Sequence, residues 1–340
     1  MQLKKLHEFS IQKFFRIAMR RVKYFEVFAL VFLILTLIGS LSVGSTTISM
    51  TDSIISLIRD TEYSYIIRKI RLPRVFGSTF CGGILALSGV AFQTSFKNEL
   101  ADPYLLGVSS GASLSIAIAT MIGLVTTNVF SLPILAFVGA IIASAIAVGI
   151  DYKTPQTIIL SGVAVSSLFS ALTSFLIYMN RNSLSGVYFW TMGSFSSLSL
   201  QKMTILLVTM IIEFNLLHLS AKSMDILLLD HLSARSLGVN PIESRVKILL
   251  ISAISTSIAV SFCGVIGFTG IVSPHIARKI VGPSHKNLLF SSMIVGAWIM
   301  TIADTISRTV LAPAEIPVGI ITSIIGCPLF LVLAIRGKKK

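Results

Sequence analysis

The sequence predicts an all-α integral membrane protein. This prediction rests on the amino-acid composition and on the length of the apolar stretches. Of the 340 residues, 54% are hydrophobic and only 12% are charged, whereas an ordinary soluble domain is about 25% charged. The mean hydropathy is +0.88. Because a helix of roughly 20 apolar residues crosses a bilayer, the apolar stretches have room for about ten helical crossings. A soluble globule is therefore excluded.

The first 23 residues are predicted to form a basic amphipathic segment in the cytoplasm. Lysines and arginines alternate there with leucine, isoleucine and phenylalanine, a pattern suited to an anionic inner leaflet. A cleaved signal peptide is the competing interpretation. The apolar run from Phe25 to about Leu41 is longer than a usual signal core, however, and many spans follow it. We therefore expect residues 24–336 to form the transmembrane domain.

The length of the apolar runs predicts nine further spans after the first. They are expected near residues 75–94, 104–124, 130–150, 157–179, 202–219, 246–264, 268–280, 288–306 and 317–335. An even number of crossings places both termini in the cytoplasm, in agreement with the basic tail at residues 337–340. Gly139, Ala143 and Ala147 recur at every fourth position, a spacing that lets helices approach closely in lipid. This pattern predicts one compact bundle.

The excess of basic residues orients these spans. Lys plus Arg number 28 and Asp plus Glu number 14, which gives a formal net charge of +14. No basic stripe is interleaved with aromatic residues as on a nucleic-acid surface, so we expect contact with membrane lipid and not with nucleic acid. The positive-inside rule leaves a set of basic residues facing outward that invites a functional explanation, namely Arg59, Arg68, Lys69, Arg71, Arg74, Arg181, Lys202 and Arg308.

Motifs for covalent chemistry and for metal binding are missing from the sequence. It contains no GxxxxGK[ST] phosphate loop and no HExxH. The cysteines are far apart and His275 has no second ligand at metal spacing, so we predict no enzymatic activity, no metal site and no cofactor. Glu213 is the one acidic residue well inside a predicted span. Because ion-coupled carriers depend on buried ionisable groups, we expect the energy source to lie outside this chain.

Two polar features have two interpretations each when read from the residues alone. Residues of about 220–242 form the longest cytoplasmic break, with a short leucine-rich face and a Gly238 to Pro241 pattern typical of a helix stop. This segment either rests on lipid or docks into a partner. Asp304 and Arg308 are four residues apart on one helix face. They either neutralise the end of a span or prepare an arginine for an outside partner.

Two segments dense in motifs bear on these alternatives. Residues 71–113 read RLPRVFGSTFCGGILALSGVAFQTSFKNELADPYLLGVSSGAS, and residues 264–330 include GVIGFTGIVSPHIARKIVGPSHKN and ADTISRTVLAPAEIPVGIITSIIGCPLF. Together they resemble the FecCD-like permeases, the iron-siderophore, haem and cobalamin branch of the ABC importers. The resemblance covers nearly the whole chain after the first span. It implies the type II ABC importer permease fold, with ten transmembrane helices in each subunit.

The resemblance also implies partners and residue roles. A pair of permeases, identical or paralogous, would work with two ABC ATPase subunits and an extracytoplasmic substrate-binding protein. Arg71, Arg74 and Arg308 match the RLPR and ADxxxR motifs and would dock the binding protein through its carboxylates, with Asp304 supporting Arg308. The resemblance further implies a coupling loop that contacts the ATPase through Leu227, Leu229, Ala234 and Leu237, with a break at Gly238. It also implies a cytoplasmic gate at Pro155 and Gln156.

The sequence therefore predicts a permease subunit in the cytoplasmic (inner) membrane. It would translocate an iron-siderophore-type chelate, or haem or cobalamin, driven by ATP hydrolysis in a separate subunit. The alternative is an ion-coupled secondary transporter that works without an ATPase. The two differ in whether this chain alone supports uptake.

Overall fold

The structure, a computed structural model, describes residues 2–44, 46–124, 128–179 and 181–337, with side chains for residues 22–44, 46–124, 128–179 and 186–328. Within these ranges the regular structure is helical, and no strand is found. The all-α prediction is therefore confirmed.

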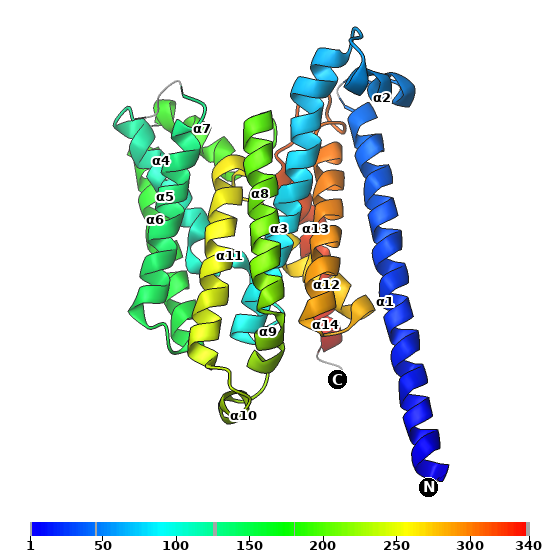
Figure 1. Cartoon of the computed structure of the whole chain (residues 1–340). Coiled ribbons are helices and arrows are strands. Elements are labelled where there is room, and N and C mark those ends of the chain that lie inside the picture. Colours follow the sequence, from blue (N-terminus) through cyan, green and yellow to red (C-terminus); the bar gives the residue numbers. More distant parts are fainter. Residues whose placement is uncertain (1, 45, 125–127, 180, 338–340) are drawn as a thin grey trace.

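Ten helices of 13 residues or more form the bundle (Figure 1) over the part of the chain that the structure describes: α1 (Gln2–Ser42), α3 (Leu72–Phe96), α4 (Val108–Met121), α5 (Ser131–Ile150), α6 (Pro155–Met179), α8 (Leu200–Leu219), α11 (Pro241–Cys263), α12 (Thr269–Val281), α13 (His285–Ser307) and α14 (Val318–Gly337). Each overlaps one predicted span. By length and composition, seven described helices could cross a membrane, while Val108–Met121 and Val318–Pro328 are shorter apolar helices. The chain is a multi-pass membrane protein.

Six short helices lie between the long ones: α2 (Met50–Ile58), η1 (Ile66–Arg71), η2 (Pro103–Leu106), α7 (Arg181–Thr191), α9 (Ala221–Leu227) and α10 (His231–Ser236). In Figure 1, α10 projects at the end of the bundle where α1 begins and α14 ends, and α2 lies at the opposite end. We call these the α10 end and the α2 end. The backbone of α1 continues through residue 23, so the predicted N-terminal segment and the first span belong to one helix.

Helix α3 is the centre of the bundle. All but three of its 25 residues are buried, and it packs against α8, α11, α12 and α13. Its contact with α13 is close, because a Cβ on Gly82 would lie 2.3 Å from the Gly296 carbonyl oxygen. A Cβ on Gly139 of α5 would likewise lie 2.2 Å from the carbonyl oxygen of Gly111 in α4. The close packing predicted around Gly139 is therefore confirmed.

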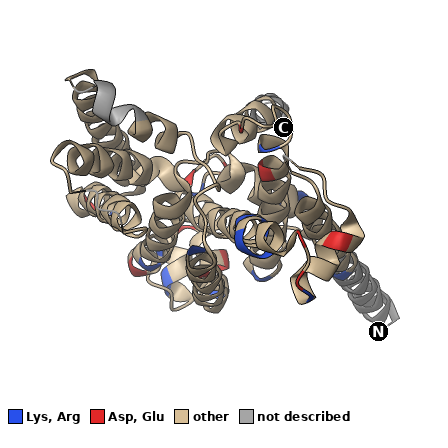
Figure 2. Cartoon of the chain, turned by 90° about the horizontal axis from the view of Figure 1, so that it is seen from above, with Lys and Arg blue, Asp and Glu red and all other residues tan. Residues whose placement is uncertain are grey.

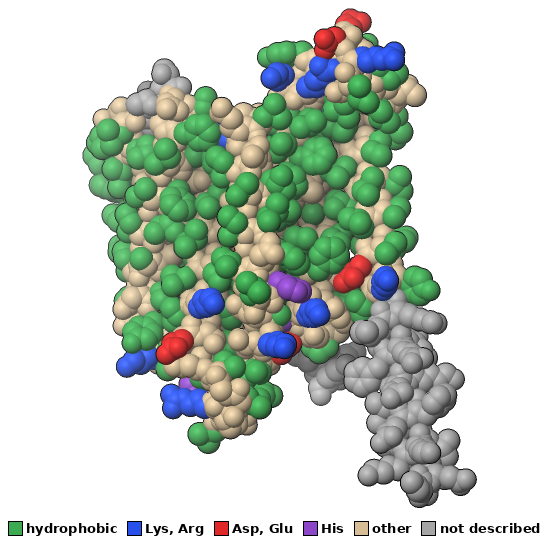
Figure 3. Space-filling model, in the orientation of Figure 1, with side chains coloured by type: hydrophobic (Ala, Val, Ile, Leu, Met, Phe, Trp, Pro, Cys, Tyr) green, Lys and Arg blue, Asp and Glu red, His purple; other side chains and the backbone are tan. Residues whose placement is uncertain are grey.

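Hydrophobic side chains cover the outside of the bundle between its two ends. Large exposed residues such as Ile134 on α5, Leu160 on α6 and Val208 on α8 face outward. On the face drawn in Figure 3 these side chains fill the middle, and most charged ones gather near the top and in the lower third. Viewed from above in Figure 2, Lys, Arg, Asp and Glu are isolated patches among uncharged helices. A surface of this kind suits a lipid environment.

Candidate functional site

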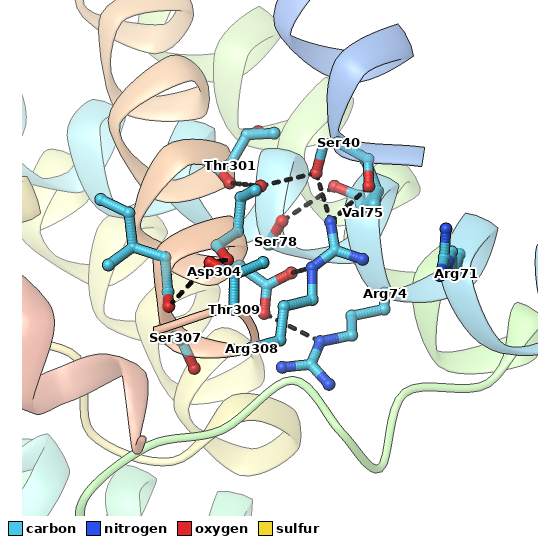
Figure 4. A network of polar contacts seen from close by, with 12 residues as sticks. Ser40, Arg71, Arg74, Val75, Ser78, Thr301, Asp304, Ser307, Arg308 and Thr309 are labelled. Carbon is cyan, nitrogen blue, oxygen red and sulfur yellow. Dashed lines mark hydrogen bonds and ion pairs between the residues drawn. The ribbon is translucent and has the colours of Figure 1, made fainter. Parts of the chain in front are cut away.

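A buried ion-pair network lies at the α2 end and joins α3 to α13. Arg74 donates from Nε to Asp304 Oδ1 at 2.9 Å, and from Nη1 to Glu315 Oε1 at 2.6 Å. Asp304 is fully buried, and Glu315 lies in the segment just before α14. Figure 4 shows the Asp304 carboxylate between the side chains of Arg74 and Arg308. The Arg74 guanidinium therefore joins α3 to two carboxylates that lie more than 200 residues further along the chain.

Arg308 joins the same network to α1. Its Nη2 donates to the hydroxyl of Ser40 at 2.6 Å and also to the Ser40 carbonyl oxygen. Its Nε lies 3.6 Å from Asp304 Oδ2, which makes an ion pair without a hydrogen bond. Asp304 therefore contacts Arg308 through an ion pair, and its supporting role stays a prediction. Asp304 forms its hydrogen bond with Arg74, and Ser40 of α1 is the hydrogen-bonding partner that orients Arg308.

Arg71 lies apart from the other two arginines (Figure 4) and binds the end of α1. Its Nη1 donates to the carbonyl oxygens of Leu41 and Ser42, each at 2.8 Å. Its Nη2 donates to the carbonyl oxygen of Thr46 and, at 3.0 Å, to the Thr46 hydroxyl. The last carbonyl groups of a helix have no partner within the helix. Arg71 supplies partners for those of α1.

These contacts correct the expectation that the side chains of the three arginines are accessible to a binding protein. Arg71, Arg74 and Arg308 are only 4%, 6% and 4% exposed. Within this chain they hold α1, α3, α13 and the segment before α14 together. Among the described residues of the α2 end, the exposed basic side chains are those of Arg59 and Lys69. Arg68 is less exposed and pairs with Asp60 at 2.7 Å. The sequence located the arginines correctly at this end but gave no signal of their distant partners.

The predicted coupling loop forms two short helices at the α10 end. Asp230 is the N-cap of α10 and accepts hydrogen bonds from the backbone N–H groups of Leu232 and Ser233 at 3.2 and 3.1 Å. Hydrogen bonds from Ser233 lower the pKa of the Asp230 carboxyl group. Gly238 follows α10 at φ 79°, a left-handed conformation that glycine adopts readily. The helix stop predicted at Gly238 is confirmed.

Only part of the predicted contact face of this loop is accessible. Leu227 and Ala234 are 3% and 1% exposed, so both side chains lie in the interior. The prediction that these two residues contact a partner is therefore corrected. Leu229 and Leu237 are 44% and 58% exposed. Leu228 and Leu232, which belong to the same leucine-rich face of the sequence, are 45% and 81% exposed. We call these four accessible side chains the leucine patch, which comprises Leu228, Leu229, Leu232 and Leu237.

Polar side chains surround the base of the loop. Lys97, just after α3, donates from Nζ to the Leu229 carbonyl oxygen. His275 and Arg278 of α12 lie 3.2 and 3.4 Å from the Glu99 carboxylate, which gives His275 a structural partner. Asp225 of α9 pairs with His285 at the start of α13. Sequence reasoning did not single out Asp225 or His285, because their pairing joins residues 60 positions apart.

The predicted gate residues lie at the same end of the bundle. Pro155 is the first residue of α6, and Gln156 after it is exposed. The preceding turn is held to α11 by Arg245, whose Nη1 donates to the Lys153 carbonyl oxygen at 3.2 Å. The gate role of Pro155 and Gln156 stays a prediction.

Glu213 is fully buried at the junction of α3, α8 and α11. Ser88 of α3 contributes a hydroxyl group 2.6 Å from Glu213 Oε1, and Thr256 of α11 donates to the same hydroxyl at 2.9 Å. The residue therefore belongs to a hydrogen-bonded link between three helices. Among the described residues, no group of three His, Cys, Asp or Glu side chains is arranged to hold a metal ion.

Comparison with known proteins adds an independent result. Residues 32–336 match the FecCD transport family. The hemin transport system permease protein HmuU of Yersinia pestis is 35% identical over 330 residues, which cover 92% of this chain and 96% of that protein. The cobalamin import system permease protein BtuC of Halobacterium salinarum is 37% identical over 272 residues, covering 79% and 73% of the two chains.

A solved structure agrees with this match. An inward-facing metal-chelate type ABC transporter superposes with a TM-score of 0.82 at 31% identity, covering 92% of this chain and 98% of that one. The predicted permease fold is thereby confirmed. By sequence and by fold, the chain belongs to the FecCD transport family, a family of ABC transporter permeases.

Proposed function

We propose that this chain is the membrane-spanning subunit of a binding-protein-dependent ABC importer in the cytoplasmic membrane. Its cargo would be an iron-siderophore-type chelate, or haem or cobalamin. The related HmuU and BtuC proteins are named for hemin and cobalamin, which supports a bulky chelate as cargo. ATP hydrolysis would take place in a separate subunit, so this chain itself would catalyse no covalent reaction.

The observation that carries this proposal is the leucine patch on the α9–α10 loop. Exposed apolar side chains rimmed by polar ones mark a contact with a protein or a membrane. Here the rim consists of Asp230, His231 and Arg235, and α10 projects beyond the neighbouring helices in Figure 1. A projecting patch favours a protein over the bilayer. The proposed occupant is an ABC ATPase subunit, one copy for each of two permeases.

The charge distribution supports a cytoplasmic location for the α10 end. Basic residues gather in the turns and helix termini at this end, namely Lys97, Lys153, Lys222, Arg235, Arg245, Lys247, Arg278, Lys279 and Lys286. The positive-inside rule places such residues in the cytoplasm. Both termini would then be cytoplasmic, and the α2 end would face the binding protein.

At the α2 end we propose that the buried arginines shape the docking surface and that exposed cations contact the binding protein. Arg71, Arg74 and Arg308 fix the relative positions of α1, α3 and α13. Arg59 and Lys69 are exposed at the same end and can attract carboxylates on an incoming protein. A second permease copy, identical or paralogous, would complete the cargo pathway, with Pro155 and Gln156 near its cytoplasmic gate.

Reconstitution tests the proposal against the ion-coupled alternative. The chain is placed in proteoliposomes alone, with an ABC ATPase subunit, and with both the ATPase and a binding protein loaded with ferric chelate. We expect uptake only in the complete system and only with ATP. Uptake by the chain alone under a proton or sodium gradient would contradict the proposal and would point to Glu213 as the coupling residue.

A further inference from the structure

The α9–α10 loop is attached to the bundle mainly through α9. Helix α10 packs on α9 and α11, whereas α9 packs on α3, α8, α11 and α13. Ala221, Met224 and Leu227 of α9 are buried among apolar side chains of α3 and α13. Any force on the leucine patch therefore reaches the transmembrane helices largely by way of α9.

Asp225 of α9 caps the first turn of α13. The N-cap residue of α13, Ser284, makes no capping hydrogen bond with its own side chain. Instead Asp225 Oδ1 accepts from the backbone N–H of His285 at 3.0 Å and from the His285 ring Nδ1 at 2.6 Å. A carboxylate is favourable at the N-terminus of a helix because of the helix dipole. One helix thus supplies the cap that another lacks.

The His285 ring extends this contact to α3. Because a carboxylate only accepts hydrogen bonds, Nδ1 carries the proton that points to Asp225. Nε2 on the other side of the ring lies 2.6 Å from the Thr94 hydroxyl of α3. The His285 side chain is 2% exposed, whereas that of Asp225 is 43% exposed. We call Asp225, His285 and Thr94 the three-helix link, since α9, α13 and α3 meet at this imidazole.

Helices α3 and α13 remain in contact from the three-helix link to the α2 end. Gly82 and Gly296 bring their backbones together midway along the pair. The hydroxyl groups of Thr79 and Thr301 are hydrogen-bonded at 2.8 Å. Arg74 and Asp304 close the pair at the far end. Because packed interiors transmit displacement with little compression, a shift of this pair at one end moves the other end too.

We infer that the three-helix link connects the ATP-hydrolysing partner to the α3–α13 pair, and that His285 is a positioning residue for coupling. This inference rests on the proposed function and deepens it. His285 fixes where α9 stands relative to α3 and α13. Without its ring, α9 keeps its apolar packing but can shift without carrying α13 along.

The experiment compares variants in the complete reconstituted system, with purified permease, ABC ATPase and binding protein loaded with ferric chelate. The readout is cargo moved per ATP hydrolysed. For His285→Ala we expect a fall of at least about fivefold, with ATP hydrolysis within about twofold of the unmodified complex. A merely structural role would lower the amount of assembled complex and leave cargo per ATP unchanged.

Two further variants make the result decisive. Thr94→Val keeps the side-chain shape, removes the hydroxyl group at Nε2, and is expected to lower cargo per ATP in the same direction. His218→Ala is the matched control, because the His218 ring stacks on Phe214 of its own helix at 5.4 Å and lies outside the link. It should leave cargo per ATP unchanged.

Three outcomes would overturn the inference. They are unchanged cargo per ATP in His285→Ala, an equal fall in His218→Ala, and, where His285→Ala does not fold, unchanged cargo per ATP in Thr94→Val. An unmodified complex that shows no ATP-driven uptake would contradict the proposed function itself and would remove the inference with it. The two failures are therefore distinguishable.

Discussion

Arg74 and Asp304 form a 2.9 Å ion pair between α3 and α13, although they are 230 residues apart in the sequence. The Asp304 side chain is fully buried and that of Arg74 is 7% exposed. Glu315 adds a second carboxylate to the same guanidinium at 2.6 Å. Through these two ion pairs, Arg74 holds α3, α13 and the segment before α14 together at the α2 end.

Arg74→Met should destabilise the protein strongly. The buried Asp304 carboxylate would keep only its 3.6 Å contact with Arg308, and removing one partner of a buried ion pair costs about 3–5 kcal/mol. Arg68→Met is the control, because Arg68 pairs with Asp60, whose side chain is 92% exposed. Exposed pairs contribute about 1 kcal/mol or less. Thermal unfolding in detergent should show a much larger loss for Arg74→Met, and equal losses would contradict this role.

Gly296→Ala should separate α3 from α13. The new Cβ would lie 2.4 Å from the Gly82 carbonyl oxygen, which cannot move aside without moving α3. Overpacking of this kind costs about 1–3 kcal/mol. Gly149→Ala in α5 is the matched control, since a Cβ there meets nothing within 4 Å. The melting temperature should fall for Gly296→Ala and stay level or rise for Gly149→Ala.

The leucine patch should be required for ATPase binding and dispensable for folding. Leu229→Asp together with Leu232→Asp places charges on side chains that are 44% and 81% exposed. We expect co-purification of an ABC ATPase subunit to fall by about tenfold or more, because burying an unpaired carboxylate in an apolar contact is costly. Leu227→Asp, at a position 3% exposed, should instead reduce the yield of folded protein. Full co-purification of the double variant would exclude the patch as the docking surface.

Docking at the α2 end should depend on the exposed cations. Arg59→Glu together with Lys69→Glu should weaken capture of the binding protein at low ionic strength by about tenfold, through repulsion of its carboxylates. The difference should shrink in high salt, which screens exposed charges. Reversing Arg71, Arg74 and Arg308 together is expected to disrupt the fold, because all three are buried. Salt-independent capture by the Arg59 and Lys69 variant would contradict the proposed contact.

Asp102 should make stability depend on pH. Burial raises the pKa of its carboxyl group from 3.8 to about 6. The folded protein therefore holds a proton that the unfolded chain has released, so the stabilisation present below about pH 4 is lost as the pH rises through about 6. Asp102→Asn keeps an acceptor for the Tyr104 N–H, now bonded at 2.8 Å. Its thermal stability should vary less over this pH range than that of the unmodified protein.

The short spans show how far run length alone can predict a membrane bundle. Helices α4 and α12 have 14 and 13 residues. Both were expected from their apolar runs at 104–124 and 268–280. The loop at 220–242 was also located correctly, but Ala234 was assigned to the wrong side of it. Its two helices are separated by a turn at residues 228–230, so one helical period does not extend across both.

The amino-acid sequence by itself determined the helical class, the order of the crossings and which motifs gather at each end, because hydrophobic run length and local charge are properties of neighbouring residues. Only the tertiary structure decided that Arg71, Arg74 and Arg308 are buried and that His285 joins α9 to α3. Whether a guanidinium or an imidazole is exposed depends on partners far along the chain. Arg308, for example, binds Ser40 across 268 positions, a pairing that no local pattern encodes.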